Sequence, residues 1–265
     1  MASRGRATIS AVVITYNEEG NIRGCLESLR WVDEIVLVDS QSSDRTVSIA
    51  REFTDRIFVR IFVRPWPGFP AQRNFGIAQA TGEWILILDA DERVTPEAQR
   101  EIATWLASPE SQEYAAAQVP RRNYFFGKWL RFGGAYPDYQ WRLFKRGKIR
   151  YDEATLDTPV IDGLSKVLDA PFDHFTGERI SERIRKINRE TDYKAKERLA
   201  TKKKVYGSDL FIRPLATFVK IYFLKKGFRD GVEGCIYGLL SSLYTFVRYV
   251  KLWELTRGED CWWQR

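Results

Sequence analysis

Asp89, Asp91 and Glu92 follow directly on an apolar run, Trp84–Leu88, in this chain of 265 residues. The run has the composition of a buried strand, so the three carboxylates are predicted to lie at its carboxyl end. Carboxylates near a core are costly unless something offsets their charge. A hard divalent cation, Mg²⁺ or Mn²⁺, would offset it, and such cations commonly bind substrate phosphates as well. An isolated D-x-D favours a solvated turn before a helix that begins near Thr95, so the interpretation depends on the neighbouring strand ends.

Two earlier apolar runs, Ile9–Ile14 and Glu34–Val38, also end in polar and acidic residues. The residues in question are Thr15, Tyr16, Asn17, Glu18, Asp39 and Asp44. Asp39 and Asp44 are expected to accept hydrogen bonds from a base or a ribose, and Tyr16 to pack against the base. Each has a simpler alternative, because Asp44 can cap a helix and Tyr16 can be a packing residue. Gathered on one rim, the set favours a nucleotide-sugar pocket.

The elements that would position these residues alternate between strand and helix. A helical stripe is formed by Ile22, Leu26 and Leu29, and further helices are expected from Ser43 or Asp44 and over residues 71–80. Another strand is expected over residues 57–63. Continuous apolar strands that alternate with helices predict an α/β fold with a mostly parallel sheet covered on both faces. Ligands of such sheets bind beyond the carboxyl ends of the strands.

A tandem repeat occupies the third predicted strand, where Ile57–Arg60 is followed at once by Ile61–Arg64. An insertion of even length keeps the alternation of a strand's two faces, so the strand can absorb it without exposing the core face. The repeat can equally lengthen the loop that follows. We assign it no function.

Asp138 is a further candidate for chemistry. It lies in a segment rich in aromatic residues, glycine and arginine, between Tyr136 and Tyr139. Aromatic surroundings raise the pKa of a carboxyl group, and this favours a role as general base. Aromatic and polar groups on glycine-flanked loops also suit a sugar-binding surface, although an ordinary packed loop accounts for them almost as well.

The composition limits the kinds of site that the chain can contain. Its single histidine, His174, excludes His-rich metal sites and argues against a Ser-His-Asp triad, so a general base is expected to be a carboxylate. The cysteines, Cys25, Cys235 and Cys261, are odd in number and far apart. They indicate neither a disulfide framework nor a zinc site, and they fit a reducing compartment. No secretory signal is expected, because the first apolar run is too short.

Positive charge is concentrated towards the C-terminus. Residues 178–229 contain 16 Lys or Arg and 6 Asp or Glu, a balance of +10, whereas the whole chain has a net charge of +7. A helix is expected over residues 181–204, and from Phe211 the chain interleaves apolar with basic residues. Residues 235–247 carry no charge but are too few to predict a membrane span. The pattern favours association with an anionic membrane surface over nucleic-acid binding. The alternative is a soluble helical subdomain that packs on the sheet.

Several motifs occur together and in a fixed order along the chain. They are Ser10–Glu19, Val38–Ser40, Ser43–Thr46, Gln72–Phe75, Ala80–Trp84, Leu88–Arg93 and Tyr136–Gln140. On this set the chain resembles the family 2 glycosyltransferases of the GT-A fold, and within them the bacterial branch that extends the lipopolysaccharide core, often described as β-glucosyltransferases. The likeness covers nearly the whole chain, weakens after Arg150 and returns around Phe218–Glu254. No single motif is specific, but the ordered set is.

The resemblance implies a domain organisation and a role for each candidate residue. A Rossmann-like GT-A domain would span residues 1–177, with a nucleotide-binding half at about 1–95 and an acceptor half at about 96–177, and residues 178–265 would form a basic, amphipathic helical tail. The implied roles are Thr15, Tyr16, Asn17, Glu18, Asp39 and Asp44 in the nucleotide pocket, Arg73 at the donor diphosphate, Asp91 with Asp89 at the metal, and Asp138 as the base.

The expected reaction is an inverting, metal-dependent transfer of a sugar from a UDP-linked donor to a glycolipid of the lipopolysaccharide-core type. It would take place at the cytoplasmic face of the inner membrane, with the protein bound peripherally or monotopically. A polyprenyl-phosphate sugar transferase is the first alternative, because its anionic acceptor needs no base. A non-catalytic protein that binds membrane surfaces is the second. A nicotinamide oxidoreductase is disfavoured, since no G-x-G-x-x-G follows the first strand.

Overall fold

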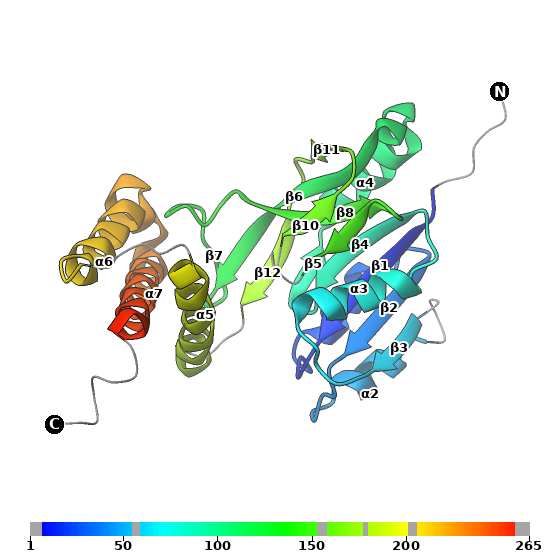
Figure 1. Ribbon diagram of the computed structural model, residues 1–265. Helices are drawn as coiled ribbons and strands as arrows, with labels where there is room; N and C mark the ends of the chain where they lie inside the picture. The colour runs from blue at the N-terminus through cyan, green and yellow to red at the C-terminus, as the bar shows by residue number, and fades with distance from the viewer. Residues whose placement is uncertain (1–6, 55–58, 153–157, 177–179, 201–205, 258–265) are drawn as a thin grey trace. The chain divides into compact units, whose positions relative to one another are not determined.

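The chain divides into two compact units. The computed structural model describes residues 7–54, 59–152, 158–176, 180–200 and 206–257 (Figure 1). The first unit comprises Met1–Arg122 and Pro137–Phe175, and the second comprises Asn123–Tyr136 and Thr176–Arg265. Residues 123–136, which the sequence places in the acceptor half of the first domain, therefore group with the C-terminal helices.

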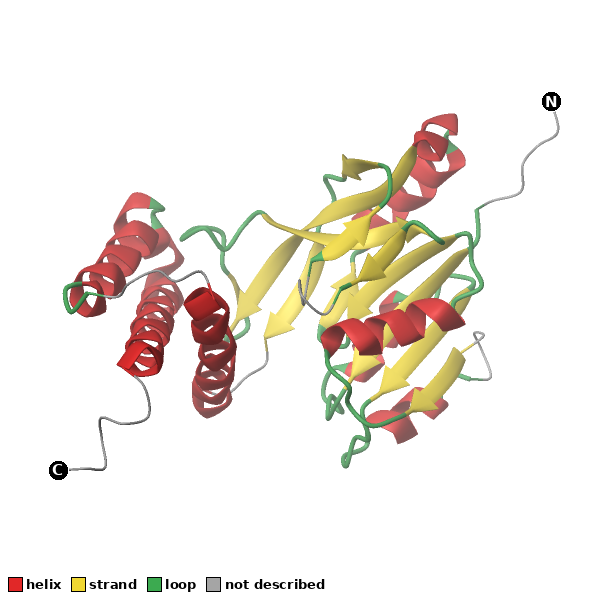
Figure 2. Cartoon of the chain, viewed as in Figure 1, coloured by secondary structure: helices red, strands yellow, loops and turns green. Residues whose placement is uncertain are grey.

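The first half of the first unit is an α/β arrangement, as predicted (Figure 2). Four parallel strands lie in the order β3-β2-β1-β4, and four helices connect or follow them. The strands are β1 (Ile9–Thr15), β2 (Glu34–Asp39), β3 (Val59–Val63) and β4 (Trp84–Asp89). The helices are α1 (Ile22–Ser28), α2 (Thr46–Arg51), α3 (Phe69–Gln79) and α4 (Pro96–Ala107). Of the tandem repeat, Ile57 and Phe58 lie outside the described residues, and the remainder forms most of β3.

The helix boundaries follow from local chemistry. Thr95 caps α4, because its hydroxyl accepts a hydrogen bond from the backbone N–H of Ala98 at 3.1 Å, and Pro96 occupies the first helical position, where no N–H is needed. At the start of α2, Asp44 rather than Ser43 accepts from the backbone N–H of Thr46, at 2.9 Å. Both helices thus begin where the sequence predicts them.

Antiparallel strands complete the sheet, which is consequently mixed. Next to β4 lies β8 (Asp138–Lys145), followed by β6 (Tyr114–Phe125), β12 (Phe172–Thr176) and β5 (Glu92–Val94). Shorter elements are η1 (Pro109–Glu113), β11 (Leu164–Val167), which pairs with β6, and the separate pair of β9 (Ile149–Tyr151) and β10 (Pro159–Ile161). Two of these pairings matter for the site: β6 places Arg121 opposite Asp138, and β12 places His174 opposite Glu92.

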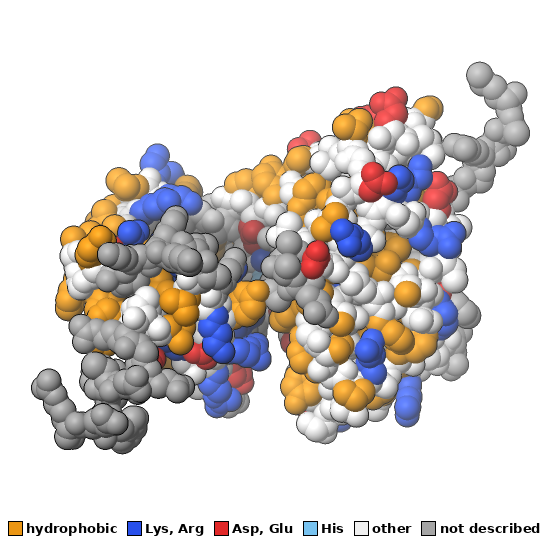
Figure 3. All heavy atoms as spheres, in the orientation of Figure 1, with side chains coloured by type: hydrophobic (Ala, Val, Ile, Leu, Met, Phe, Trp, Pro, Cys, Tyr) orange, Lys and Arg blue, Asp and Glu red, His pale blue; other side chains and the backbone are white. Residues whose placement is uncertain are grey.

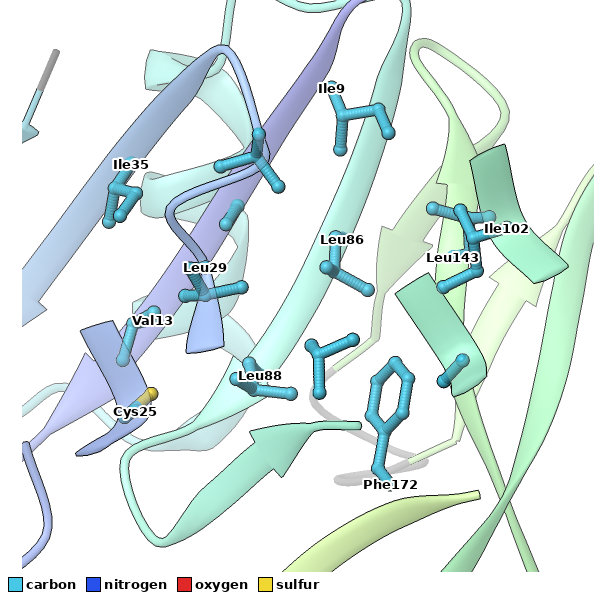
Figure 4. Packing of buried hydrophobic residues seen from close by; sticks show 14 of the residues in the cluster. Ile9, Val13, Cys25, Leu29, Ile35, Leu86, Leu88, Ile102, Leu143 and Phe172 are labelled. Atoms are coloured by element: carbon cyan, nitrogen blue, oxygen red, sulfur yellow. The ribbon is translucent and has the colours of Figure 1, made fainter. Parts of the chain in front are cut away.

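The core lies on both faces of the parallel strands. Ala11 and Val13 of β1 pack into a cluster that includes Leu29, whereas Val12 and Ile14 pack into a second cluster with Val38 and Ile85. Figure 4 shows the first cluster, with Val13, Leu86 and Leu88 near Leu29. Because both faces are covered, every residue of β1 and β2 is buried, and this explains why their sequences are continuously apolar rather than alternating.

The second unit is mainly helical. It contains α5 (Ile180–Ala200), α6 (Asp209–Val219) and α7 (Gly231–Arg257), and both α5 and α6 pack on α7. A π-helical turn, η2 (Lys220–Leu224), and a 3₁₀ turn, η3 (Gly227–Asp230), connect α6 to α7. Residues 123–136, with the short strand β7 (Lys128–Trp129), pack against α7 through Leu130 and through Lys128, whose Nζ lies 2.9 Å from Glu233. None of the described helices is both long enough and apolar enough to cross a membrane.

Candidate active site at the carboxyl ends of the strands

Hydrogen bonds join the loop after β1 to the loop after β2. Asn17 adopts the left-handed region, with a φ of 53°, which asparagine tolerates better than most residues. Its backbone N–H donates to the hydroxyl of Ser42 at 2.8 Å, and its side-chain oxygen accepts from the backbone N–H of Ser43 at 2.8 Å. The reciprocal pair holds the two loops together on the rim that the sequence predicts to be a nucleotide pocket.

Asp44 extends this connection between the loops. Its carboxylate accepts from the backbone N–H of Glu19 at 3.0 Å and from the backbone and hydroxyl of Thr46. Burial opposes ionisation here, but the hydrogen bonds outweigh it, so the pKa of Asp44 lies below its usual range. The backbone N–H of Glu18 donates to Thr46 at 2.7 Å. Asp44 therefore both starts α2 and organises the rim.

The other predicted pocket residues differ in how accessible they are. Tyr16 is 59% exposed and available to a ligand. Asp39 is fully buried and accepts hydrogen bonds from the backbone N–H and hydroxyl of Ser42, so its carboxylate orders the loop after β2 and is not exposed to a ligand. Thr15 is buried, and within the described part of the chain its hydroxyl has no hydrogen-bond partner.

Asp89 lies between two buried arginines at the end of β4. Arg73 from α3 approaches one carboxylate oxygen at 3.2 Å, and Arg142 from β8 donates to the other at 2.9 Å. Burial opposes ionisation, but Arg142 and Arg73 more than compensate for it and lower the pKa of Asp89 well below its usual range. Both oxygens of Asp89 are thus engaged by guanidinium groups.

Glu92 carries the ion pairs further. It is completely buried, and one of its oxygens accepts from Arg142 at 2.7 Å and from Arg121 at 3.1 Å. Arg121 in turn holds Asp138 through two nitrogens, at 2.7 Å and 3.0 Å. The connected side chains are Arg73, Asp89, Arg142, Glu92, Arg121 and Asp138. We call this set the charge network; its three guanidinium groups and three carboxylates balance.

The charge network joins the D-x-D motif to the predicted base. Asp138 also accepts from the amide of Gln140 at 2.7 Å, so its carboxylate contacts polar groups and is not enclosed by aromatic rings alone. Burial opposes protonation of Arg142, but Glu92 and Asp89 outweigh it and raise the pKa of Arg142. The predicted donor side and acceptor side of the site are consequently coupled through charged hydrogen bonds.

Asp91 faces a residue that the sequence does not associate with it. Nε2 of His174 lies 3.2 Å from Oδ2 of Asp91, and both side chains are partly exposed. The backbone N–H of Phe175 donates to the carbonyl of Asp91 at 2.9 Å, which holds β12 against the motif. A carboxylate and an imidazole form a donor set for a divalent cation such as Mn²⁺. No group of three or more His, Cys, Asp or Glu side chains placed to hold a metal occurs among the described residues.

Comparison with known proteins settles the family. The profile described as "Glycosyl transferase family 2" matches residues 10–170. The chain belongs to glycosyl transferase family 2. It is 30% identical over 253 residues to the lipopolysaccharide core biosynthesis glycosyltransferase LpsC of Rhizobium meliloti, covering 93% of this chain and 92% of LpsC. An uncharacterized glycosyltransferase of Rickettsia felis is 28% identical, with coverage of 97% and 96%.

Solved structures share the fold of this family 2 glycosyltransferase. The mannosyltransferase PcManGT from Pyrobaculum calidifontis, in complex with GDP-Man and Mn²⁺, aligns with a TM-score of 0.56 at 19% identity, covering 94% of this chain and 87% of PcManGT. Residues 1–349 of TarS from S. aureus, in complex with UDP-GlcNAc, align with a TM-score of 0.50 at 16% identity, with coverage of 94% and 91%. The predicted GT-A fold is therefore confirmed.

Proposed function

We propose that this family 2 glycosyltransferase transfers a sugar, with inversion, from a UDP-linked donor to a hydroxyl group of a glycolipid of the lipopolysaccharide-core type. The relationship to LpsC over nearly the full length of both chains supports the acceptor class. Complexes of related folds with nucleotide sugars support the donor class. The loops around Asn17 and Asp44 would hold the nucleotide, with Tyr16 against the base.

The observation that carries the proposal is the electrostatic balance around the D-x-D motif. The charge network contains as many guanidinium groups as carboxylates, so it has no net charge with which to bind a donor diphosphate. A cation held by Asp91 and His174 would provide that positive charge, acting as a Lewis acid on the leaving diphosphate. Asp89, with one guanidinium contact on each oxygen, would support Asp91 at the metal and orient Arg73 towards the diphosphate.

Asp138 is the proposed base for the acceptor hydroxyl. General base catalysis requires an ionised carboxylate within hydrogen-bond reach of the proton that it removes. Arg121 donates twice to one oxygen of Asp138 and Gln140 donates to the other, which fixes the orientation of the carboxylate. Through Glu92 and Arg142 the base would keep a fixed position with respect to the D-x-D motif.

The helical unit would bring the enzyme to its lipid acceptor. Apolar residues stand exposed along α6 and the turns that follow it, including Phe211 at 75% and Leu224 at 73%. Lys220, Lys225 and Lys226 accompany them, and Figure 3 shows hydrophobic and basic side chains interspersed over this unit. Exposed apolar groups among lysines are typical of a protein that binds anionic membrane surfaces from one side. This supports a peripheral or monotopic position at the cytoplasmic face of the inner membrane.

A panel of nucleotide sugars tests the function directly. Nucleotide release is measured for each donor with and without a lipopolysaccharide-core acceptor, in Mn²⁺ or Mg²⁺ and in the presence of a chelator. Release that requires a UDP-sugar, the acceptor and the metal is expected. Unchanged turnover in chelator would contradict metal dependence, and turnover with polyprenyl phosphate but not with a hydroxyl acceptor would favour the polyprenyl-phosphate transferase alternative.

A further inference from the structure

A cavity of about 280 Å³ lies within the helical unit, between α5, α6 and α7. Two arginines line it, Arg183 from α5 and Arg248 from α7, together with hydroxyl groups of Thr217, Ser241 and Thr245. Among the described residues that line it, Glu190 is the only carboxylate. The charged groups of the cavity therefore have a positive balance, whereas the charge network of the active site is neutral.

Arg248 is the most informative residue of this cavity. Its Nε is buried and has no hydrogen-bond acceptor among the described residues. The contacts of its guanidinium group are with aromatic faces, because it lies 5.8 Å from the ring centre of Tyr244 and 5.3 Å from that of Tyr249. Buried donors in native proteins are nearly always paired, so an unpaired guanidinium N–H in a cavity indicates a missing acceptor.

The hydroxyl groups of Thr217, Ser241 and Thr245 each have a backbone carbonyl within hydrogen-bond distance. Thr217 donates to the carbonyl of Arg213 at 2.9 Å, Ser241 to that of Tyr237 at 2.8 Å, and Thr245 to that of Ser241 at 3.0 Å. The hydroxyl groups of Thr217 and Thr245 also lie 3.2 Å apart, so these groups have partners within the helices, whereas the buried Nε–H of Arg248 has no acceptor among the described residues. A planar guanidinium group with several N–H donors matches the oxygens of a phosphate group.

Apolar surroundings identify the source of such a phosphate. Leu239, Leu243 and Phe246 are exposed on α7, one residue away from cavity-lining positions, and Ile212 and Leu215 are exposed on α6. A phosphate that arrives attached to acyl chains can place its oxygens at Arg248 while its chains lie along these side chains. A soluble phosphate gains nothing from them.

We propose that the cavity between α5, α6 and α7 binds the phosphate group of an anionic lipid headgroup, with Arg248 as the principal donor. The proposal rests on the membrane association put forward above and deepens it, because it replaces diffuse attraction by a specific site. The helical unit would then bind a lipid molecule in a defined orientation, and not only a charged surface.

Conservative substitutions separate a specific site from general attraction. Vesicle flotation of the full chain is measured with phosphatidylcholine vesicles that contain or lack phosphatidylglycerol. Arg248→Lys keeps the charge but loses the planar fork, so binding to phosphatidylglycerol vesicles is expected to weaken about tenfold. Arg185→Lys, the same substitution at an exposed position of α5 outside the cavity lining, serves as the matched control and is expected to stay within about twofold of wild type. Equal binding by wild type and Arg248→Lys would overturn the proposal.

A second variant and a soluble probe complete the test. Ser241→Leu fills the cavity without changing any charge and is expected to weaken binding similarly; if Arg248→Lys does not fold, this variant decides. Short-chain phosphatidylglycerol is expected to raise the melting temperature of the wild type more than inorganic phosphate does, and an equal effect would show that the site takes a free anion. Formation of a stable dimer that does not bind vesicles would also refute the proposed lipid site.

Nucleotide release with a water-soluble core oligosaccharide as the acceptor, in the absence of vesicles, separates this proposal from the proposed function. Arg248→Lys and Ser241→Leu are expected to keep the wild-type rate, because neither residue belongs to the site around Asp91. If the wild type releases no nucleotide from any donor, the transferase proposal fails while the flotation results still stand.

Discussion

Oδ2 of Asp91 lies 3.2 Å from Nε2 of His174, although 83 residues separate the two in the chain. The antiparallel pairing of β12 with β5 produces this proximity, since it places His174 opposite Glu92, the residue after Asp91. The only histidine of the chain thus lies beside the acidic motif that the sequence singles out. This relationship carries the first two predictions.

Asp91→Asn is expected to reduce sugar transfer more than about 100-fold, because the change removes the charged ligand of the proposed metal. Asp91 is partly exposed, so the melting temperature should remain close to that of the wild type. Nucleotide release and thermal unfolding measure the two effects. Asp162→Asn, at an exposed position paired with Lys148, is the control and should keep full activity. Full activity in Asp91→Asn would refute the metal assignment.

His174→Gln is expected to change the preference of the enzyme between metals. Imidazole is a better ligand for transition metals than for Mg²⁺, which prefers oxygen. Affinity for Mn²⁺ should therefore fall about 10- to 100-fold, while affinity for Mg²⁺ should change less. Titration of the UDP-bound protein, followed by the electron paramagnetic resonance of free Mn²⁺, gives the first value, and competition by Mg²⁺ gives the second. Equal losses for both metals would contradict a ligand role for the imidazole.

Glu92→Gln tests the charge network. The substitution keeps the shape of the side chain but leaves Arg142 and Arg121 without their shared buried carboxylate. Removal of one partner from a buried ion pair typically costs about 3–5 kcal/mol of folding free energy. Denaturant unfolding measures the loss, with the exposed Glu97→Gln as a control expected to stay within about 0.5 kcal/mol of wild type. A loss for Glu92→Gln as small as that of the control would show that the network does not stabilise the fold.

Asp138→Asn separates the two transferase hypotheses. If Asp138 removes the acceptor proton, kcat with a hydroxyl acceptor should fall about 10²- to 10⁴-fold, and donor affinity should be retained. A phosphate acceptor needs no base, so a polyprenyl-phosphate transferase would lose little. Steady-state kinetics with each acceptor, together with calorimetric titration of the donor, distinguishes these outcomes. A variant that also loses donor affinity would indicate that Asp138 acts through Arg121 on the metal side.

Glu34 makes the free energy of unfolding depend on pH. Burial opposes its ionisation, but hydrogen bonds from Ser10, Thr81 and Arg60 prevail, so the pKa of Glu34 is lowered in the folded state. The carboxylate therefore stabilises the fold above the unfolded-state pKa of about 4.3, and this contribution is lost as the pH falls through the folded-state pKa. Glu34→Gln should have a lower free energy of unfolding than the wild type at neutral pH. Its free energy of unfolding should also change less between about pH 5 and pH 3. Denaturant unfolding at a series of pH values measures this. The same dependence of the unfolding free energy on pH in both proteins would contradict the prediction.

The strands and loops of the nucleotide-binding half follow from the sequence because they depend on local pattern. Apolar runs such as Ile9–Ile14 become strands buried on both faces, and the residues after them become the rim loops. The family, the enzyme class and the GT-A fold predicted from the ordered motifs are confirmed by the comparisons. The roles of the individual site residues remain predictions.

The partners of those residues do not follow from the sequence. Arg121, Arg142 and His174 reach the site from antiparallel strands whose register is set by tertiary packing, so no spacing along the chain brings them near Asp89 or Asp91. For the same reason the sequence suggests apolar surroundings for Asp138, whereas Arg121 lies directly opposite it across β6 and β8. The one sequence feature that marks His174 is that it is the only histidine of the chain.

The hydrogen bonds between Asn17, Ser42 and Ser43 have a consequence for recognition of the donor. Because these bonds order the two rim loops when the chain folds, little conformational entropy remains to be lost when a ligand binds. Loosening the loops, for instance by Asn17→Ala, would therefore act chiefly on affinity and on discrimination between nucleotides. The two ordered loops therefore act as a rigid template. Differences among relatives in the nucleotide base that they select should arise from the side chains on these loops rather than from movement of the loops.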